Sequence, residues 1–302
     1  MALRRLILER KLPPEEIKRL EVSQPWISSN GDPQHYTLIA DSWELPGMLI
    51  DESCSARDKV TGRMIFHLLR GVLQPREYEL AWNYLRSGGT PVSGSSRGRT
   101  VGQGDPEHQD QDAMERVIGF MNRQGGRFQY ARRTGWTQDH EKEYLAVEQF
   151  IRRFDEIARH YAPDEWAGQW AVAQTRPEYV MCGTTFSTGT VNLGIRCRPH
   201  RDKGNLCLSA MTVTDLSPAP VQGGELLLPE YLCSINIRNE DLLLFDGHVL
   251  HATAQFYTAA SPSLICGVQR LSCIFYYRAG LAKCLAPEEE LRRAQQRMAA
   301  TW

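Results

Sequence analysis

The sequence predicts an α+β protein in which a mainly helical N-terminal part precedes a β-sandwich or barrel, and a helix closes the chain. Three observations predict this class. Apolar residues recur at helical spacing before residue 165, short β-branched and aromatic runs begin near residue 178, and a segment rich in Glu and Arg ends the chain. We assign residues 1–165, 166–284 and 285–302 to these parts, and we do not expect 165/166 to separate independent domains.

Four segments of the N-terminal part carry apolar residues at helical spacing, which predicts amphipathic helices. They are residues 56–73, 75–87, 112–124 and 143–162. We expect the last helix to end near Pro163, because proline lacks the N–H that a helix interior requires.

A Gly/Ser-rich stretch, residues 87–104, separates two of these helices and has only two valines as apolar residues. Such a segment is too polar to pack, so we expect a flexible loop over residues 87–109. The loop can be a surface linker or a flap that contacts substrate, and the sequence leaves both open. A His-x-Asp pair at His108 and Asp110 follows, where an aspartate is more typical of a helix N-cap than of a metal ligand.

The strand-rich part contains eight short runs of β-forming residues separated by Gly, Pro, Asp and Asn. They are residues 184–195, 206–214, 223–229, 233–237, 241–245, 248–256, 263–268 and 270–277. Many short strands with turn signals between them favour an antiparallel sandwich or barrel. The closing helix is expected over residues 287–300.

Composition is that of a globular protein with no overall bias toward nucleic acid. The 302 residues are 42% hydrophobic and 24% charged, with a formal net charge of −1. A role in nucleic-acid binding therefore has to rest on local basic patches. No run approaches the roughly 18 apolar residues of a membrane span, so we expect no membrane association.

Eight cysteines are scattered without a C-x-x-C pair, which argues against a zinc knuckle or a thioredoxin-like site. Several lie in apolar runs, where a reduced cysteine packs as a small hydrophobe. We expect an intracellular protein, in the nucleus if its source is eukaryotic and otherwise in the cytoplasm, and we expect a monomer.

The stretch "RPHRDKGN", residues 198–205, places His200 and Asp202 two positions apart where the strand-rich part begins. Side chains at i and i+2 of a strand face the same side, so both can point at one centre. For a third ligand we select His251 in "DLLLFDGHVLHAT" rather than His248, which belongs to the turn. Two histidines and one carboxylate form the facial triad of non-haem Fe(II) oxygenases. The alternative is a set of unrelated surface histidines and a turn aspartate.

The stretch "RLSCIFYYR" is expected to be the last core strand, with Arg270, Ser272, Ile274, Tyr276 and Arg278 on one face. A buried arginine is costly unless an anion meets it. A dicarboxylate co-substrate such as 2-oxoglutarate supplies that anion, gripped by Arg270 in bidentate fashion with the Ser272 hydroxyl beside it. The alternative is an edge-strand arginine paired with an Asp or Glu.

On these residues, the sequence resembles the TET/JBP family of 2-oxoglutarate/Fe(II)-dependent nucleic-acid base dioxygenases, such as TET-like 5-methylcytosine dioxygenases. The motifs "PHRDKGN", "GGELLLP", "DLLLFDG", "LHAT" and "RLSCIFYY" carry the resemblance, which covers residues 186–278, about a third of the chain. The stretch "MNRQGGRFQYARRTGWTQD" is similar to small microbial and algal members. The resemblance implies a double-stranded β-helix, or jelly roll, as the core.

The same resemblance implies an enzyme that uses Fe(II), 2-oxoglutarate and O2. It implies that His200, Asp202 and His251 bind the iron, and that Arg270 and Ser272 hold 2-oxoglutarate. The intact triad and Arg270 argue against a non-catalytic DNA-binding module built on a relic barrel.

The implied substrate is the 5-methyl group of a base in DNA, flipped from a duplex or taken from a single strand. Asn205 matches a position that contacts this base, and Tyr276 one that stacks on it. Gly204 and Arg278 depart from the pattern, because vertebrate TET enzymes carry histidines at both positions. We expect 5-methylcytosine first, oxidised to 5-hydroxymethylcytosine and beyond, with thymine as the alternative. A small molecule or a protein side chain is a further alternative.

Two local patches are candidates for binding DNA. Residues 121–137 contain four arginines, including Arg132 and Arg133, three aromatic residues and no acid. Basic and aromatic side chains together suit phosphates and unstacked bases. Arg198 lies in a second basic cluster beside the predicted metal ligands. The alternative for both patches is a solvated basic loop.

Overall fold

The computed structural model describes residues 3–22, 48–85, 90–91, 100–101, 114–123, 130–197, 199–217, 219–254, 256–258 and 270–300. The predicted flexible loop lies mostly outside these residues, and the predicted strand over 263–268, the pair His108 and Asp110, and Arg198 lie wholly outside them.

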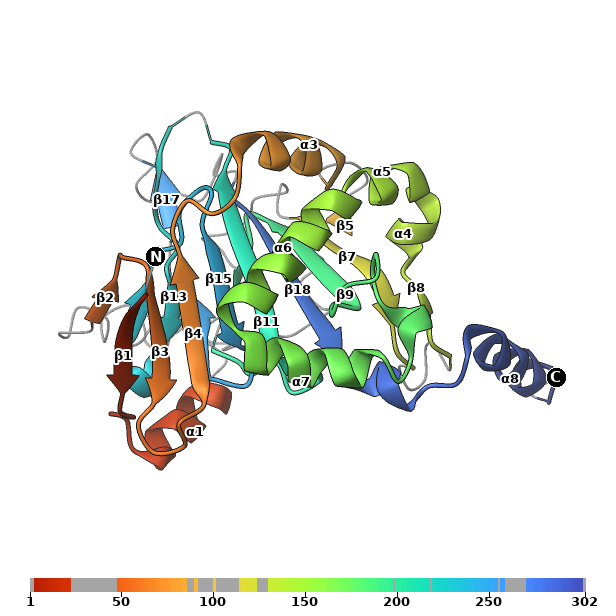
Figure 1. Ribbon diagram of the computed structural model, residues 1–302, viewed down its shortest axis with the longest axis horizontal. Helices are drawn as coiled ribbons and strands as arrows, with labels where there is room; N and C mark the ends of the chain where they lie inside the picture. Colours follow the sequence, from red (N-terminus) through yellow and green to blue (C-terminus); the bar gives the residue numbers. More distant parts are fainter. Residues whose placement is uncertain are drawn as a thin grey trace, which may run out of the picture.

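A large sheet forms one wall of the protein (Figure 1). Its described strands are β1 (Arg4–Leu8), β3 (Cys54–Asp58), β4 (Met64–Leu69), β5 (Thr90–Pro91), β7 (Met114–Met121), β8 (Arg132–Arg133), β9 (Thr188–Leu193), β11 (Asn205–Asp215), β15 (Leu242–Asp246) and β18 (Arg270–Arg278). Their order is β1-β3-β4-β15-β11-β18-β9-β7-β5, with β8 paired to β7. Strands from the N-terminal part thus pair directly with strands of the core.

Shorter strands make the opposite wall. They are β2 (Met48–Ile50), β6 (Thr100–Val101), β10 (Arg196–Cys197), β12 (Val221–Gly223), β13 (Leu226–Leu228), β14 (Cys233–Ile235), β16 (Ala252–Thr253) and β17 (Phe256–Thr258). They form a sheet of order β16-β13-β14-β2 and the pairs β10-β6 and β12-β17. Buried residues of both walls, among them Leu226, Ile235, Met211 and Phe245, pack in one cluster. The predicted jelly roll is confirmed.

Helices cover the outer face of the large sheet (Figure 1). The described helices are α1 (Pro14–Val22), α3 (Pro75–Leu85), α4 (Gly135–Asp139), α5 (Glu141–Ala146), α6 (Glu148–Tyr161), α7 (Pro163–Ala173) and α8 (Pro287–Ala300), with 3-10 turns η1 (Pro177–Tyr179), η2 (Pro229–Tyr231) and η3 (Ala279–Lys283). Helix α6 packs through Phe150 and Phe154 on Phe275 of β18, and the Phe154 and Phe275 ring centroids lie 5.0 Å apart. This contact anchors the outer hydrophobic core. Among the described helices, none has the length and apolar character needed to cross a bilayer.

Two predicted helices are wrong. Residues 56–73 contain the end of β3 and all of β4, joined by a turn in which the Asp58 carboxylate accepts hydrogen bonds from the Val60 and Thr61 amides. Residues 112–124 contain β7. β4 is buried along its whole length, so its apolar residues lack the strict alternation that marks a half-buried strand. In β7, apolar residues lie on both faces, with Val117 and Phe120 partly exposed and Ile118 and Met121 buried, so the strand also lacks an alternating apolar pattern.

The other predicted helices are confirmed, two of them with shifted ends. Residues 75–87 contain α3, and residues 143–162 contain the end of α5 and all of α6. Pro163 follows the end of α6 and begins α7, where its missing N–H costs nothing. Residues 287–300 are α8, which projects from the two-sheet body (Figure 1).

We expect a buried histidine of β4 to make the stability depend on pH. His67 is 7% exposed, and neither ring nitrogen has a hydrogen-bond partner among the described residues. Burial, with Arg57 nearby, lowers the pKa of His67 to about 4. As pH falls, His67 is protonated in the unfolded chain near its ordinary pKa of about 6.5, well before it is protonated in the folded protein. The folded protein therefore has its full stability, as far as His67 is concerned, above about pH 6.5, and loses that part as pH falls toward about 4.

The free energy of unfolding should therefore fall by about 2 kcal/mol between about pH 7 and pH 5 through this group. Urea unfolding at the two pH values measures the change. His67→Leu should remove that part of the pH dependence, and a variant with the parent's full pH dependence would contradict the prediction.

Candidate active site

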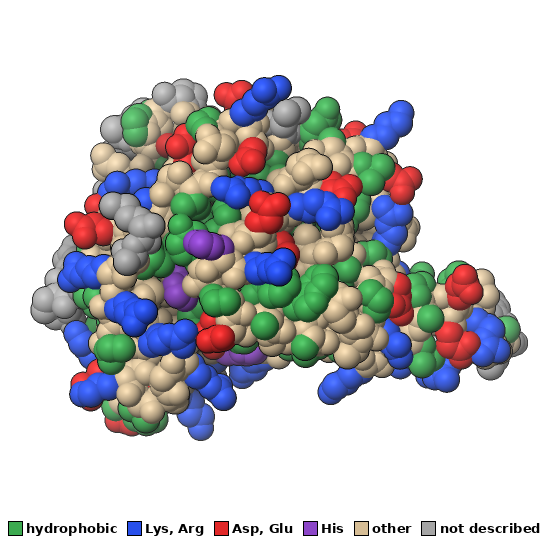
Figure 2. Space-filling view, in the orientation of Figure 1, with side chains coloured by type: hydrophobic (Ala, Val, Ile, Leu, Met, Phe, Trp, Pro, Cys, Tyr) green, Lys and Arg blue, Asp and Glu red, His purple; other side chains and the backbone are tan. Residues whose placement is uncertain are grey.

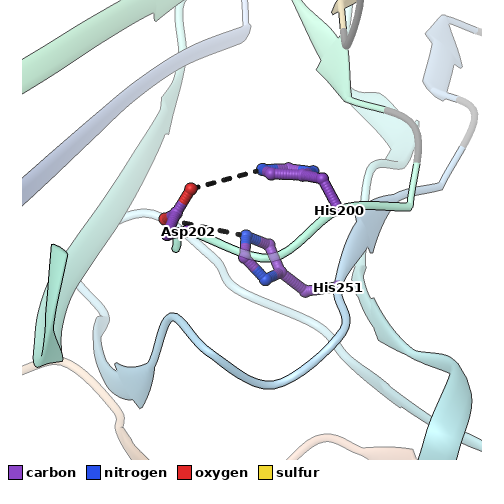
Figure 3. Close-up of side chains that lie close together, drawn as sticks. All are labelled: His200, Asp202 and His251. Carbon is purple, nitrogen blue, oxygen red and sulfur yellow. Dashed lines mark ion pairs between the residues drawn. The ribbon is translucent and has the colours of Figure 1, made fainter. Parts of the chain in front are cut away.

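The structure brings His200, Asp202 and His251 together (Figure 3). His200 and His251 face each other in an isolated antiparallel bridge, in which each backbone N–H donates to the other's carbonyl at 2.9 and 3.0 Å. The Asp202 amide donates to the Gly247 carbonyl at 2.8 Å. Backbone hydrogen bonds thus join the two distant segments that carry the three side chains.

The three side chains point at a common centre (Figure 3). Asp202 Oδ1 lies 3.7 Å from His200 Nε2, and Asp202 Oδ2 lies 4.0 Å from His251 Nε2. One donor atom from each residue lies within 4.8 Å of the others. Two imidazoles and one carboxylate at these separations fit a divalent iron ion, which accepts this mixed donor set and leaves coordination positions open.

A backbone hydrogen bond orients the His251 ring. Its Nδ1 lies 2.8 Å from the Val249 carbonyl, which requires the proton on Nδ1 and leaves the Nε2 lone pair facing Asp202. His248 lies in the turn after β15, where its Nδ1 is 3.0 Å from Asp246 Oδ1. Of the two histidines, only His251 joins the described cluster.

Glycine at position 247 permits the close approach of Asp202. A Cβ atom at Gly247 would lie 3.2 Å from both Cβ and Oδ2 of Asp202. The "DG" turn after β15 therefore has a second role that the sequence did not reveal, which is to leave room for a metal ligand.

A cavity of about 580 Å³ opens beside the triad. Its size falls within the roughly 300–1,000 Å³ of small-molecule sites. The even-numbered residues of β18, from Arg270 to Arg278, all line it, whereas Leu271, Cys273 and Phe275 pack in the outer core. The predicted alternation of this strand is confirmed.

Arg270 is 6% exposed within the cavity wall, and Ser272 lies beside it on the same face. Burial lowers the pKa of Arg270 to about 10, so the guanidinium stays charged at neutral pH. Its Nη2 donates to the Gly224 carbonyl at 2.7 Å. A buried charged fork that faces a cavity fits the carboxylate of a dicarboxylic acid.

The second glycine of the "GGE" motif, Gly224, packs against Arg270. Gly224 has a φ of +79°, a left-handed conformation that favours glycine, and a Cβ atom there would lie 2.8 Å from Arg270 Nε. Gly224 therefore supplies both the space and the carbonyl that hold Arg270. The sequence shows the motif but gives no sign of this role.

The residues predicted to contact the base line the same cavity. Asn205 and Arg278 lie opposite each other across β11 and β18. The Tyr276 hydroxyl is hydrogen-bonded to Thr190 Oγ1 at 2.9 Å, which fixes the ring. Arg278 Nε donates to Asn122 Oδ1 at 2.8 Å, a contact that the sequence pattern did not predict although Asn122 lies in the "MNRQ" stretch.

Two arginines of the predicted basic patch are bound by acidic side chains. Arg133 donates to Glu141 Oε1 at 3.0 Å, and Arg123 is bound by the buried Glu290 carboxylate. Arg132 lies opposite Met121 in the antiparallel β7–β8 ladder, and Met121 lines the cavity. On the face shown in Figure 2, Lys and Arg side chains are mixed with Asp and Glu over the upper part, and several Lys and Arg gather at the lower left. The acids that compensate this arginine-rich stretch come from α5 and α8, beyond the stretch itself.

The protein has a jelly-roll fold, a His-Asp-His cluster and a buried arginine in the cavity wall. These features together define an oxygenase of the 2-oxoglutarate/Fe(II)-dependent class. Comparison with known families agrees, since the Tet_JBP family, the oxygenase domain of the 2OGFeDO superfamily, matches residues 117–279. The chain belongs to this Tet_JBP family. Oxygenases of this superfamily use Fe(II) and 2-oxoglutarate.

Relatives of known function carry this domain within much longer chains. Thymine dioxygenase JBP1 of Trypanosoma brucei brucei is 32% identical over 166 residues, which are 55% of this chain and 19% of the relative. Thymine dioxygenase JBP1 of Crithidia fasciculata is 28% identical over 244 residues, which are 80% of this chain and 28% of the relative. The matches thus span between 19% and 28% of the length of these two relatives.

A solved structure shares the fold. The structure of NgTET1 in complex with 5mC DNA has a TM-score of 0.52 at 11% identity, and the match covers 94% of this chain and 100% of that chain. At this identity the likeness concerns the arrangement of helices and strands.

Proposed function

We propose that this protein oxidises the 5-methyl group of a pyrimidine base in DNA. One observation carries the proposal. A single cavity joins the His-Asp-His cluster, the buried Arg270 with Ser272, and the polar and aromatic residues Asn205, Tyr276 and Arg278. Such a cavity offers one end to a dicarboxylic acid and the other to a planar base.

Each group of residues has a distinct role in this proposal. His200, Asp202 and His251 would hold Fe(II), and Arg270 with Ser272 would hold 2-oxoglutarate. When bound, iron and 2-oxoglutarate supply O2-dependent oxidation coupled to decarboxylation of the keto acid. The Tyr276 ring, held by Thr190, offers a surface on which an extruded base stacks.

The base itself has two candidates. The TET resemblance favours 5-methylcytosine, whereas the named activity of the JBP1 relatives favours thymine. Arg278 adds a physical argument, because a guanidinium only donates hydrogen bonds and thymine presents a carbonyl acceptor where 5-methylcytosine presents an amino donor. A Cβ at Gly204 would lie 3.9 Å from Arg278 Nη2, so the missing side chain there leaves room beside this guanidinium.

Nucleoside mass spectrometry tests the proposal. Duplex and single-stranded oligonucleotides that contain 5-methylcytosine and thymine are incubated with protein, Fe(II) and 2-oxoglutarate. Formation of 5-hydroxymethylcytosine or 5-hydroxymethyluracil supports oxidation and separates the two bases, and a His200→Ala/Asp202→Ala protein should be silent. If neither product forms while 2-oxoglutarate is consumed with a small molecule or peptide, the DNA substrate is wrong.

Arg132 should contribute more to DNA binding than Arg133. Arg132 lies opposite the cavity-lining Met121 in the β7–β8 pair, whereas Arg133 lies opposite Phe120, which packs against the outer core. We expect Arg132→Glu to weaken binding and to lower the slope of log K against log salt by about 1, as for one lost phosphate contact. Fluorescence anisotropy at several KCl concentrations measures both quantities.

Arg153→Glu on α6 is the matched control, since Arg153 pairs with Glu156 on the helix-covered face. Equal effects of the Arg132 and Arg153 substitutions would remove Arg132 from the DNA interface.

A further inference from the structure

A carboxylate outside the cavity connects the two chain segments that carry the metal ligands. Glu230 follows Pro229 in η2 and is 1% exposed. Its Oε2 accepts a hydrogen bond from Arg201 Nη1 at 2.9 Å and another from the Leu250 backbone N–H at 3.0 Å. Arg10 lies 3.6 Å from the other oxygen.

The two donors to Glu230 are the immediate neighbours of all three ligands. Arg201 stands between His200 and Asp202, and Leu250 directly precedes His251. Glu230 Oε2 therefore connects the His200–Asp202 segment, through the Arg201 side chain, with the His251 segment, through the Leu250 backbone N–H. Arg201 Nη1 also donates to the His248 carbonyl at 2.7 Å, which adds a second link between the same segments.

This link lies behind the ligands and complements the backbone bridge between His200 and His251. The bridge fixes how far apart the two histidines lie, and the Asp202–Gly247 hydrogen bond fixes one further point. The residue between His200 and Asp202 is held through its side chain, by Glu230 and the His248 carbonyl. Without this anchor, the His-x-Asp segment can rotate about its backbone and separate the two ligand atoms.

Burial makes the anchor stiff. A buried carboxylate must keep its donors, because an unpaired charge or an unpaired backbone N–H in the interior is costly. The Arg201 side chain is 19% exposed and the Glu230 side chain 2% exposed, so solvent competes weakly for this ion pair.

We propose that Glu230 is a positioning residue for the iron site, acting through Arg201 and Leu250. The inference rests on the proposed function in taking the triad as the iron site, and it does not depend on the substrate. Residues that orient metal ligands from outside typically change metal affinity by about 10–100-fold when replaced. Glu230 would do so without touching the metal or the cavity.

Co(II) binding tests the proposal without turnover. Co(II) is titrated into metal-free protein, with affinity from calorimetry and geometry from the visible absorption spectrum. Glu230→Ala should weaken Co(II) binding by about 10–100-fold and alter the spectrum. Glu230→Gln should recover part of the loss, since its amide oxygen can still accept from the Leu250 N–H. If the Glu230 variants fold poorly, Arg201→Met provides an independent test. It keeps the stem of the side chain, removes the donor to Glu230, and should also weaken Co(II) binding.

Asp58→Asn is the matched control. Asp58 is 4% exposed, shares Arg10 with Glu230 and accepts from the Tyr231 hydroxyl at 2.8 Å, but it contacts neither ligand segment. We expect this substitution to lower the stability of the metal-free protein and to leave Co(II) affinity and spectrum unchanged.

Parent-like Co(II) binding by the Glu230 and Arg201 variants would overturn the inference, as would an equal loss in Asp58→Asn. A parent protein that binds no Co(II) would overturn the metal site and this inference with it. Failure of the DNA-base proposal alone leaves the Co(II) result unaffected, so the two failures are distinguishable.

Discussion

Replacing Asp202 with alanine is expected to remove metal binding and all oxidation activity. Asp202 is the one anionic donor in the described cluster, and its two oxygens lie 3.7 and 4.0 Å from the two histidine Nε2 atoms. Without this carboxylate, two neutral imidazoles remain, and they compensate only a small part of the free energy that it costs to remove water from a divalent ion. We expect metal affinity to fall by more than the roughly 10–100-fold that outer partners of metal ligands produce.

Anaerobic calorimetry with Fe(II) measures the loss, and nucleoside mass spectrometry measures activity. Asp246→Asn is a suitable control, because Asp246 lies nearby at the end of β15 but pairs with His248 at 3.0 Å. Retention of Fe(II) binding by Asp202→Ala would show that the cluster is not the metal site.

Replacing Arg270 with methionine is expected to weaken 2-oxoglutarate binding while metal binding in its absence stays unchanged. Arg270 is buried at the cavity wall, held by the Gly224 carbonyl with its charge retained. Loss of one partner of a buried, hydrogen-bonded charge pair costs about 2–5 kcal/mol, or about 30-fold to several thousand-fold in affinity. Titration of 2-oxoglutarate into the Co(II) protein measures this directly.

The chain offers a matched control in Arg116→Met. Arg116 is also 6% exposed, and burial lowers its pKa to about 10 as well, but it lies under the Trp136 ring on the outer side of β7. This control should lose stability and keep its affinity for 2-oxoglutarate. Equal losses in the two variants would mean that Arg270 acts only through stability.

The spacing of the site residues is a local property of the chain. Positions two apart on a strand share a face, which places Arg270, Ser272 and Tyr276 together on β18. The same rule predicts a strand through His200 and Asp202, and this is wrong, because both residues lie between β10 and β11. Backbone hydrogen bonds of His200 with His251 and of Asp202 with Gly247 set their positions instead. The choice of His251 over His248 follows from the turn between β15 and the next strand. These are short-range rules, and they hold because backbone geometry sets side-chain direction over a few residues.

Local pattern fails where a segment is buried on both sides. Met64–Leu69 is buried along its whole length, so its apolar residues have no free face to produce a period of two. Met114–Met121 also has the apolar spacing of a helix, although β9 and β8 hydrogen-bond to it as a strand. Which neighbours lie beside a segment depends on the whole sheet.

The sequence by itself determined a β-sandwich or barrel and the arginine face of the last strand, because both follow from alternation and turns within a few residues. The jelly roll followed from the resemblance to the TET/JBP family, and the three ligand candidates from their residue types and spacing. Only the tertiary structure decided which distant residues support them: Gly224 behind Arg270, Asn122 beside Arg278, Glu141 on Arg133, and Glu230 between the two ligand segments. Those contacts join residues that the chain separates widely. Hydrogen bonds and ion pairs of this kind depend on the positions of their atoms in space to within tenths of an ångström. A local sequence pattern contains no information about those positions.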